Sequence, residues 1–382
     1  MEPRERRTVI APFPGKGVGG KVVLLPQARG FATRLVRWHK RHGRHDLPWQ
    51  NTRDPYRVWL SEVMLQQTQV ATVIPYYARF LARFGTLAEL AAAPVGEVMA
   101  LWSGLGYYAR ARNLHACAQA VMQEHGGSFP RDPGAIARLP GIGRSTANSI
   151  ATICFSACAP ILDGNVKRVL CRCFGIEGFP GNAAVEKRLW ALAHELMPAR
   201  AGATYNQAQM DLGALICTRG APRCEACPLA DACVALASGR VADLPEPKPR
   251  RALPQRAATL LVLRAGDRVM LETRPPAGIW GGLQSLPELP EGAEAAAWAA
   301  QRYACRVLTV SPAPTLDHAF SHFRLRIAPL VLEVRPRMVA MEPGQAWVGL
   351  DRLGDAALPA PVRSILAEIQ ASGSKPLDSR KR

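Results

Sequence analysis

The sequence predicts a helical domain followed by a smaller α+β domain. From Phe31 to about Ala237, apolar residues recur at three- to four-residue spacing between glycine and proline breaks, which is typical of consecutive amphipathic helices. Beyond a proline-rich stretch, short β-type runs replace this pattern. The 382 residues are enough for two domains that each bury a core of their own.

The segments around these two regions set the expected domain boundaries. Residues 1–28 are rich in Gly, Pro and Arg without periodicity, so we expect a mobile basic extension there. The helical domain should then occupy residues 29–242. Residues 243–256 hold four prolines among basic residues, a composition that favours an extended, semi-rigid linker. The α+β domain should cover residues 257–370, and a basic tail residues 371–382.

Local patterns predict several elements inside these domains. Asp54 as a cap and Pro55 in the first turn favour a helix from Tyr56 to Gln69. In the second domain we expect three strands and one alanine-rich helix, over Ala258–Leu263, Arg268–Glu272, Arg324–Leu332 and Glu294–Tyr303.

The charge of the chain indicates a polyanionic partner. Lys and Arg number 48 against 30 Asp and Glu, which gives a net charge of +18. Part of the positive excess lies in the two ends of the chain, and a solvated basic surface without a partner is the alternative. Because a clear positive excess remains without the ends, binding to nucleic acid explains the charge better. No run reaches the roughly 18 apolar residues of a membrane span, and no export signal is visible. We therefore expect a soluble cytoplasmic protein, a monomer associated with the nucleoid.

Four of the ten cysteines lie within one 17-residue segment, separated by six, two and five residues: Cys217, Cys224, Cys227 and Cys233. Thiolates crowded into one loop suit an iron–sulfur cubane, whose irons each bind one cysteine. Zinc stays open, although zinc modules usually separate two short cysteine pairs by a longer stretch. Arg219 and Arg223 lie in the first interval, where a closed loop would present them to phosphates. The other six cysteines should be small buried side chains.

Two carboxylates have the surroundings that glycosidic bond cleavage needs. Glu62 lies on the expected helix with Val58, Trp59 and Leu65 at contact spacing, and apolar surroundings would raise its pKa toward neutrality. Asp163 precedes a second helix, where the helix dipole should keep it ionised. Glycosidic cleavage needs one acid that protonates the leaving group and one anion that stabilises the sugar cation, and Glu62 and Asp163 could supply them. A structural glutamate and a simple helix cap are the alternatives.

The segment Leu139-Pro-Gly-Ile-Gly143 joins two helical stretches by a tight turn. Gly141 and Gly143 allow close backbone approach, and the N-terminus of the following helix offers N–H groups to a phosphate. A turn without a ligand is the alternative.

Three long motifs carry a family resemblance: Trp59-Leu-Ser-Glu-Val-Met-Leu-Gln-Gln-Thr-Gln69, Gly104-Leu-Gly-Tyr-Tyr-Ala-Arg-Ala-Arg-Asn113 and Leu162-Asp-Gly-Asn-Val-Lys-Arg-Val169. With the hairpin and the cysteine intervals, the chain resembles the helix-hairpin-helix DNA glycosylases, and among them the MutY family of adenine glycosylases. The resemblance implies an all-α helix-hairpin-helix glycosylase domain with an iron–sulfur loop. It also implies one 4Fe-4S cluster and an α+β MutT-like, Nudix-fold C-terminal domain.

The same resemblance implies a substrate and residue roles. The substrate would be adenine opposite 8-oxoguanine or guanine in duplex DNA, flipped out of the stack for access. Glu62 would protonate the base and activate water, and Asn165 would support the catalytic carboxylate. Asp163 would stabilise the sugar cation or form a transient bond to the sugar. By the same likeness, Trp49 and Asp211 would hold the adenine.

Three further residues match family positions that enter the base stack: Gln67, Leu105 and Tyr107. Core packing remains an alternative for this trio, above all for Leu105.

Residue 145 separates this chain from endonuclease III-like enzymes, which share the hairpin, the aspartate and the cluster but use a lysine nucleophile eighteen residues before the aspartate. Ser145 stands at that position here, and a serine cannot form a Schiff base. We therefore expect a monofunctional glycosylase. A damage-binding protein without catalysis is the alternative of another class, disfavoured because both carboxylates stand in full motifs.

The second domain resembles a MutT-like domain through Gly278-Ile-Trp-Gly-Gly-Leu283. The stretch from Ala295 to Cys305 holds no Asp or Glu, although a Nudix hydrolase needs carboxylates there to bind a divalent metal. Lesion recognition is the expected role instead. Phe320, Ser321 and His322 match the loop with which the family reads 8-oxoguanine.

Overall fold

The computed structural model describes residues 28–249, 253–275, 278–320, 322–337, 341–354 and 356–373. The predicted basic extension and tail lie outside these ranges, apart from residues 28 and 371–373. The predicted linker is described except for residues 250–252. No helix in the described ranges combines the length and apolarity needed to cross a bilayer.

The first part of the chain is helical, as predicted. Its helices are α1 (Phe31–His42), α2 (Pro55–Leu65), α3 (Val70–Arg83), α4 (Leu87–Ala92), α5 (Val95–Trp102), α6 (Ala109–Glu124), α7 (Pro133–Ile136), α8 (Arg144–Phe155), α9 (Gly164–Phe174), α10 (Ala183–Leu196), α11 (Gly202–Leu215) and α12 (Val234–Ala237). Short 3-10 turns at Cys224–Ala226 and Ala230–Ala232 carry the cysteine loop.

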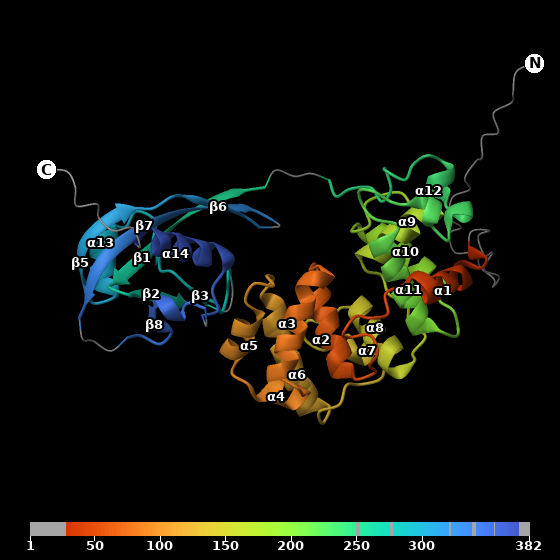
Figure 1. Ribbon diagram of the computed structural model, residues 1–382, viewed down its shortest axis with the longest axis horizontal. Coiled ribbons are helices and arrows are strands. Elements are labelled where there is room, and N and C mark those ends of the chain that lie inside the picture. Colours follow the sequence, from red (N-terminus) through yellow and green to blue (C-terminus); the bar gives the residue numbers. More distant parts are fainter. Residues whose placement is uncertain are drawn as a thin grey trace, which may run out of the picture.

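The helices form two groups, each around its own core (Figure 1). Helices α2 to α8 bury one apolar cluster, and α1 joins α9, α10 and α11 around another. Helix α1 therefore crosses back to pack on α11 although the chain between them is long. Because Glu62 belongs to the first group and Asp163 begins α9 of the second, the two carboxylates approach from opposite groups.

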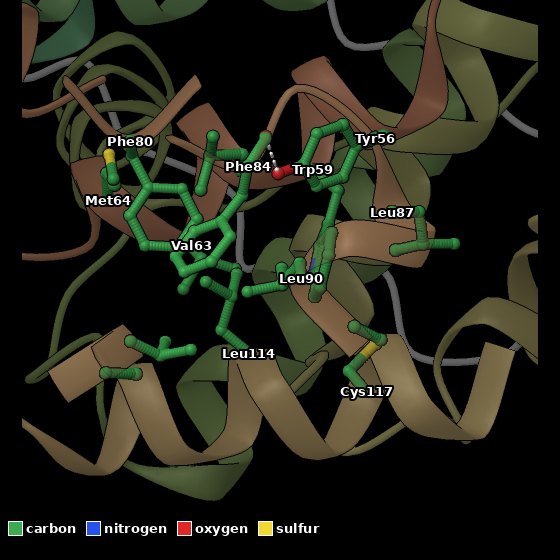
Figure 2. Close-up of a cluster of buried hydrophobic side chains, with 14 of the residues drawn as sticks. Tyr56, Trp59, Val63, Met64, Phe80, Phe84, Leu87, Leu90, Leu114 and Cys117 are labelled. Carbon is green, nitrogen blue, oxygen red and sulfur yellow. Dashed lines mark hydrogen bonds between the residues drawn. The ribbon is translucent and has the colours of Figure 1, made fainter. Parts of the chain in front are cut away.

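Helix α2 shows which local predictions succeed and where one is wrong. The Asp54 carboxylate accepts a hydrogen bond from the Tyr56 amide, and Pro55 occupies the first turn, as predicted. Figure 2 shows the core beneath it, where the Tyr56 hydroxyl donates to the Phe84 carbonyl at 2.6 Å. The helix ends at Leu65, four residues before the predicted end at Gln69. Gln67 has a φ of 56°, a left-handed conformation that no α-helix continues through.

The second part of the chain is a mixed sheet with helices on both faces. Its elements are β1 (Gln255–Ala265), β2 (Arg268–Thr273), β3 (Gln284–Ser285), β4 (Glu288–Leu289), α13 (Ala295–Arg302), β5 (Cys305–Pro312), β6 (Leu316–Ala319), β7 (Arg324–Pro336), β8 (Gln345–Gly349) and α14 (Ala360–Gly373). The strand order is β3-β2-β1-β7-β5, and β1 and β7 are parallel. The predicted strands and the alanine-rich helix are all confirmed.

Alternation along β1 explains the two-sided packing. Leu261 and Leu263 point toward α13, whereas Leu260 and Val262 join a cluster with α14. Successive side chains of a strand point to opposite faces, so one apolar run serves both cores.

Hydrogen bonds tie both the linker and the sheet domain to the helical part. At the start of the linker, the Leu244 carbonyl accepts a hydrogen bond from Arg172 and the Glu246 carboxylate accepts one from the Gly178 amide, each at 2.7 Å. Farther along the chain, the Tyr108 hydroxyl of the helical part donates to the Leu358 carbonyl at 3.3 Å. The linker therefore leaves the α9 side of the helical part, while the sheet domain rests beside α5 and α6 (Figure 1).

Candidate active site

Glu62 lies in the middle of α2 and is partly buried. Its Oε1 accepts a hydrogen bond from the Ser149 hydroxyl at 2.9 Å. Burial raises the pKa of Glu62 to about 7, the hydrogen bond from Ser149 opposes the rise, and the charge of Asp163 adds to it. The side chain therefore holds its proton in a substantial fraction of molecules at neutral pH, as its apolar neighbours in the sequence predicted.

Asp163 is the cap of α9. Its carboxylate accepts hydrogen bonds from the Val166 amide at 2.8 Å and from Asn165 Nδ2 at 3.2 Å. The sequence placed this carboxylate at a helix end that should keep it ionised. Burial instead raises the pKa of Asp163, and these hydrogen bonds only partly oppose the rise. The desolvation of the site outweighs the helix dipole here.

Helix α8 holds both carboxylates in place. The Ser145 hydroxyl accepts a hydrogen bond from the Leu162 amide at 3.0 Å, which fixes the residue before Asp163. Ser149, one helical turn later on the same face, binds Glu62. The structure thus brings together Glu62, Asp163 and Ser145 through one helix.

Arg168 connects this site to the cysteine loop. Its guanidinium donates to Asn165 Oδ1 at 2.8 Å and to the carbonyls of Gly213 and Cys217 at 2.7 Å each. A Cβ on Gly213 would lie 2.6 Å from the Cβ of Asn165, so only glycine allows this approach of α9 and α11. Asn165 is therefore held on both sides.

The four cysteines of the loop line one pocket, together with Cys173, Arg172, Arg223 and apolar side chains. No Asp, Glu or His contributes to its lining. A hydrogen bond with Cys173 lowers the pKa of Cys233 to about 6, although burial opposes this. In the part of the chain that the structure describes, no three His, Cys, Asp or Glu side chains are grouped around a single ion position. An all-sulfur donor set in an apolar wall fits the needs of an iron–sulfur cluster.

Two of the three candidate stack-entering residues are exposed on turns. Gln67 lies between α2 and α3, and Tyr107 lies between α5 and α6 and is 52% exposed. Both have left-handed backbones, with φ of 56° and 49°. Leu105, by contrast, is 6% exposed and packs in the core of the first helical group. The structure thus favours the packing alternative for Leu105.

The two residues expected to hold adenine are both buried. Trp49 is 8% exposed and packs edge-on against Tyr77. Asp211 is fully buried and accepts hydrogen bonds from Arg44 at 2.6 to 2.8 Å and from Gln207 at 2.9 Å. Although burial pushes the other way, hydrogen bonds from His39 and Arg44 lower the pKa of Asp211. Its recorded contacts are structural, and none links it to Glu62.

The hairpin glycines differ from one another. Gly141 has a φ of +73°, and a Cβ there would lie 2.5 Å from the Cβ of Asn113. Gly143 has an ordinary φ of −85° and no neighbour within 4 Å of an added Cβ. The fold therefore requires glycine at position 141 but not at 143. On the cysteine loop, Arg219 and Arg223 are both exposed, as expected.

Two family profiles match this chain. Residues 60–195 match the HhH-GPD superfamily of base excision DNA repair proteins, and residues 258–368 match the NUDIX domain. An adenine DNA glycosylase from Buchnera aphidicola (subsp. Acyrthosiphon pisum) is 35% identical over 342 residues, which cover 89% of this chain and 97% of that relative. This chain belongs to the adenine DNA glycosylase family. It is a DNA glycosylase of base excision repair.

Other comparisons agree with this assignment. The adenine DNA glycosylase of Homo sapiens is 34% identical over 417 residues, covering 91% of this glycosylase and 75% of the human chain. A solved thermostable thymine-DNA glycosylase has a TM-score of 0.51 and 29% identity, and covers 56% of this chain and 97% of its own. The predicted fold, a helix-hairpin-helix domain followed by a Nudix-fold domain, is confirmed.

Two residues that hold the carboxylates of this glycosylase, Ser149 and Arg168, were not predicted from its sequence. Ser149 could have been found from its spacing, since it follows Ser145 by one helical turn. Arg168 stands inside the motif that contains Asp163, three residues after Asn165. Only the fold shows that its other partners come from α11 and the cysteine loop.

The predicted lesion-reading loop of the glycosylase lies between β6 and β7. Phe320 is partly buried and stacks on Phe323 with 4.4 Å between ring centroids. His322 is exposed. Ser321 lies outside the described residues. Helix α13 contains no acidic residue, and Glu294 serves as its cap.

Proposed function

We propose that this glycosylase hydrolytically removes adenine paired with 8-oxoguanine or guanine in duplex DNA, without cleaving the strand. The observation that carries the proposal is the pairing of Glu62 with Asp163 across the two helical groups. Glu62 has a pKa of about 7, so it can give a proton near neutral pH. Glu62 supplies the acid that glycosidic cleavage requires, and Asp163 supplies the anion in the molecules in which it is ionised.

The reaction can be followed through the chain's own groups. The Glu62 carboxyl gives its proton to a ring nitrogen of the flipped adenine, so that the base leaves with the electrons of its glycosidic bond. Asp163, held by Val166 and Asn165, stabilises the positive charge that develops on the sugar. The Glu62 carboxylate then takes a proton from the water that attacks the sugar carbon, which restores the acid.

Ser145 supports the absence of a strand-cleaving step. Its hydroxyl is engaged by the Leu162 amide, and it carries no amine that could attack the sugar. Borohydride treatment during turnover should therefore trap little covalent complex between protein and DNA. Abundant trapped complex would contradict the monofunctional assignment.

Cys217, Cys224, Cys227 and Cys233 would hold one 4Fe-4S cluster in the sulfur-lined pocket. When bound, the cluster would supply iron–thiolate bonds that brace the loop. Arg219 and Arg223 are exposed on that loop and would meet DNA phosphates. Iron and sulfide analysis of the purified protein tests the cluster. A stoichiometric zinc content would instead support the zinc alternative.

Duplex DNA should contact several further positions of the helical part. Gln67 and Tyr107 would enter the stack, while Gly141 and Gly143 of the hairpin would approach a phosphate. Trp49 and Asp211 remain candidates for holding adenine by family likeness. For Leu105 we propose a packing role, because its side chain is in the core.

The C-terminal domain would read the base opposite the adenine. The acid-free α13 supports a role without nucleotide hydrolysis. Phe320, Ser321 and His322 are the proposed readers. Replacing both Ser321 and His322 with Ala should reduce the preference for 8-oxoguanine over guanine. Unchanged preference would contradict this part.

Single-turnover base release on a duplex with an adenine:8-oxoguanine pair tests the whole proposal. The native chain should release adenine, and Glu62→Gln and Asp163→Asn should each lose at least a hundredfold in rate, because each removes a group that acts in the transition state. Binding without release by the native chain would show a damage-binding protein instead of an enzyme.

A further inference from the structure

Arg110, near the start of α6, is the most heavily hydrogen-bonded side chain in the described first helical group that the proposed chemistry does not use. It is 9% exposed. Its guanidinium donates at 2.7 to 3.2 Å to five backbone carbonyls and one hydroxyl, those of Val63, Met64, Gln66, Leu105, Gly106 and Thr68. The acceptors come from two separate turns, so one side chain joins both.

The first turn, Gln66–Thr68, connects α2 to α3. Nη1 of Arg110 binds the Val63 and Met64 carbonyls at the end of α2 and the Gln66 carbonyl beyond it. Carbonyls at a helix C-terminus have no partner within the helix and carry negative partial charge, so a buried cation fits them. These contacts take the place of the next helical turn.

The second turn, Ser103–Tyr108, connects α5 to α6. Nη2 of Arg110 binds the Leu105 carbonyl at 3.1 Å and the Gly106 carbonyl at 3.2 Å, and the ring of Tyr107 lies 5.5 Å from the guanidinium carbon. Trp102 Nε1 also donates to the Gly106 carbonyl at 3.2 Å. The inner side of this turn is therefore fixed, while its outer side presents Tyr107.

The outermost residue of each turn, Gln67 and Tyr107, has a left-handed backbone, which residues other than glycine rarely adopt. Each carries an exposed side chain. A planar guanidinium can hold two sets of carbonyls in fixed relative positions, whereas a lysine ammonium offers fewer donors and no fork. Joining the two turns through one side chain therefore requires arginine.

We propose that Arg110 is a positioning residue that sets Gln67 and Tyr107 at one fixed separation, so that both side chains enter the DNA duplex together. The proposal rests on the proposed function in one respect only, that these two residues enter the stack. Arg110 itself is buried behind the turns, and its hydrogen bonds go to the turns and not to Glu62 or Asp163.

The test is a mutational cycle. Arg110→Lys is measured in the native chain and in a Gln67→Ala/Tyr107→Ala background, on a duplex with 2-aminopurine next to the adenine:8-oxoguanine pair. Two quantities are followed: the rise in 2-aminopurine fluorescence on binding, which reports unstacking, and the single-turnover rate of adenine release. Arg110→Lys should reduce both about tenfold in the native chain and less than twofold in the double-alanine background.

A milder pair of variants covers the case in which Arg110→Lys does not fold. Thr68→Val removes one acceptor of Arg110 and should reduce unstacking about threefold, whereas Thr72→Val, at an exposed position on α3, should change nothing. Thermal unfolding of each variant shows whether the fold is retained. Equal losses in both backgrounds, or no loss from either Arg110→Lys or Thr68→Val, would overturn the proposal.

The two readouts separate this inference from the proposed function. If the native chain unstacks the pair without releasing adenine, the proposed chemistry fails, and the fluorescence cycle still decides the role of Arg110. If the native chain releases adenine but the cycle shows no coupling, the role of Arg110 fails and the chemistry stands.

Discussion

At the scale of single residues, the chemistry depends on Glu62, a carboxyl group whose ionisation is disfavoured by burial in the fold. Glu62 lies in the middle of α2, is partly buried, and accepts a hydrogen bond from Ser149. Its pKa of about 7 lies well above the ordinary value of 4.5 because burial disfavours the charged form. The same surroundings that create the acid therefore destabilise the folded chain whenever that acid is ionised.

Replacing Glu62 with Gln should stabilise the protein at alkaline pH. The cost of burying the ionised carboxyl is small at pH 4.5, grows between pH 4.5 and 7, and is complete above pH 7. We expect the free energy of unfolding of Glu62→Gln to exceed that of the native chain by roughly 1 to 3 kcal/mol at pH 8. Urea unfolding at pH 5 and pH 8 measures this. A variant less stable than the native chain at pH 8 would argue against a desolvated Glu62.

At the scale of elements, local rules predicted the start of α2 better than its end. The start of α2 follows from Asp54 and Pro55, which act within the first turn. Its end depends on Arg110, 45 residues beyond Leu65, whose contacts no local pattern reveals. The contacts of Arg168 with Gly213 and Cys217 were missed for the same reason, because packing between helices sets them. Ser149 differs, since its spacing from Ser145 was visible in the sequence and only its Glu62 partner depends on packing.

The hairpin glycines allow a direct test of how the turn between α7 and α8 is packed. Gly141→Ala should lower the free energy of unfolding by roughly 1 to 3 kcal/mol, because the new Cβ meets Asn113 at 2.5 Å and the backbone is left-handed. Gly143→Ala should change it by less than about 0.5 kcal/mol, since the φ is ordinary and the space is open. Denaturant unfolding of the two variants side by side decides the matter. Equal destabilisation would show that the turn packs differently.

At the scale of the whole molecule, the C-terminal domain rests on the back of the turn that presents Tyr107. Tyr108 and Ser103 donate to the Leu358 carbonyl, and Arg112 donates to the Gly281 carbonyl. The sequence predicted two domains and a linker, but it gave no indication of this contact, because its acceptors are backbone groups that any residue could supply. The predicted domain boundaries themselves remain proposals.

Loosening that contact should affect recognition of the opposite base. In the variant Ser103→Ala/Tyr108→Phe, the domains lose their hydrogen bonds to Leu358, so we expect a larger radius of gyration in solution scattering and a several-fold smaller preference for 8-oxoguanine over guanine. Tyr76→Phe is the matched control, because the Tyr76 hydroxyl donates its hydrogen bond to the Ser103 carbonyl of the same turn and not to Leu358. The same loss of preference in both would show that the turn, and not the domain contact, matters.

The central claim, that Glu62 delivers the proton, is tested most directly by the pH dependence of single-turnover adenine release. Because the pKa of Glu62 is raised to about 7, the protonated fraction falls above that pH. The rate should fall about tenfold for each unit above pH 7, and it should also fall toward acid pH, because Asp163 has a raised pKa and must be ionised to stabilise the sugar cation. The residual rate of Glu62→Gln should show no such fall. A native rate that stays constant from pH 6 to pH 9 would contradict the account.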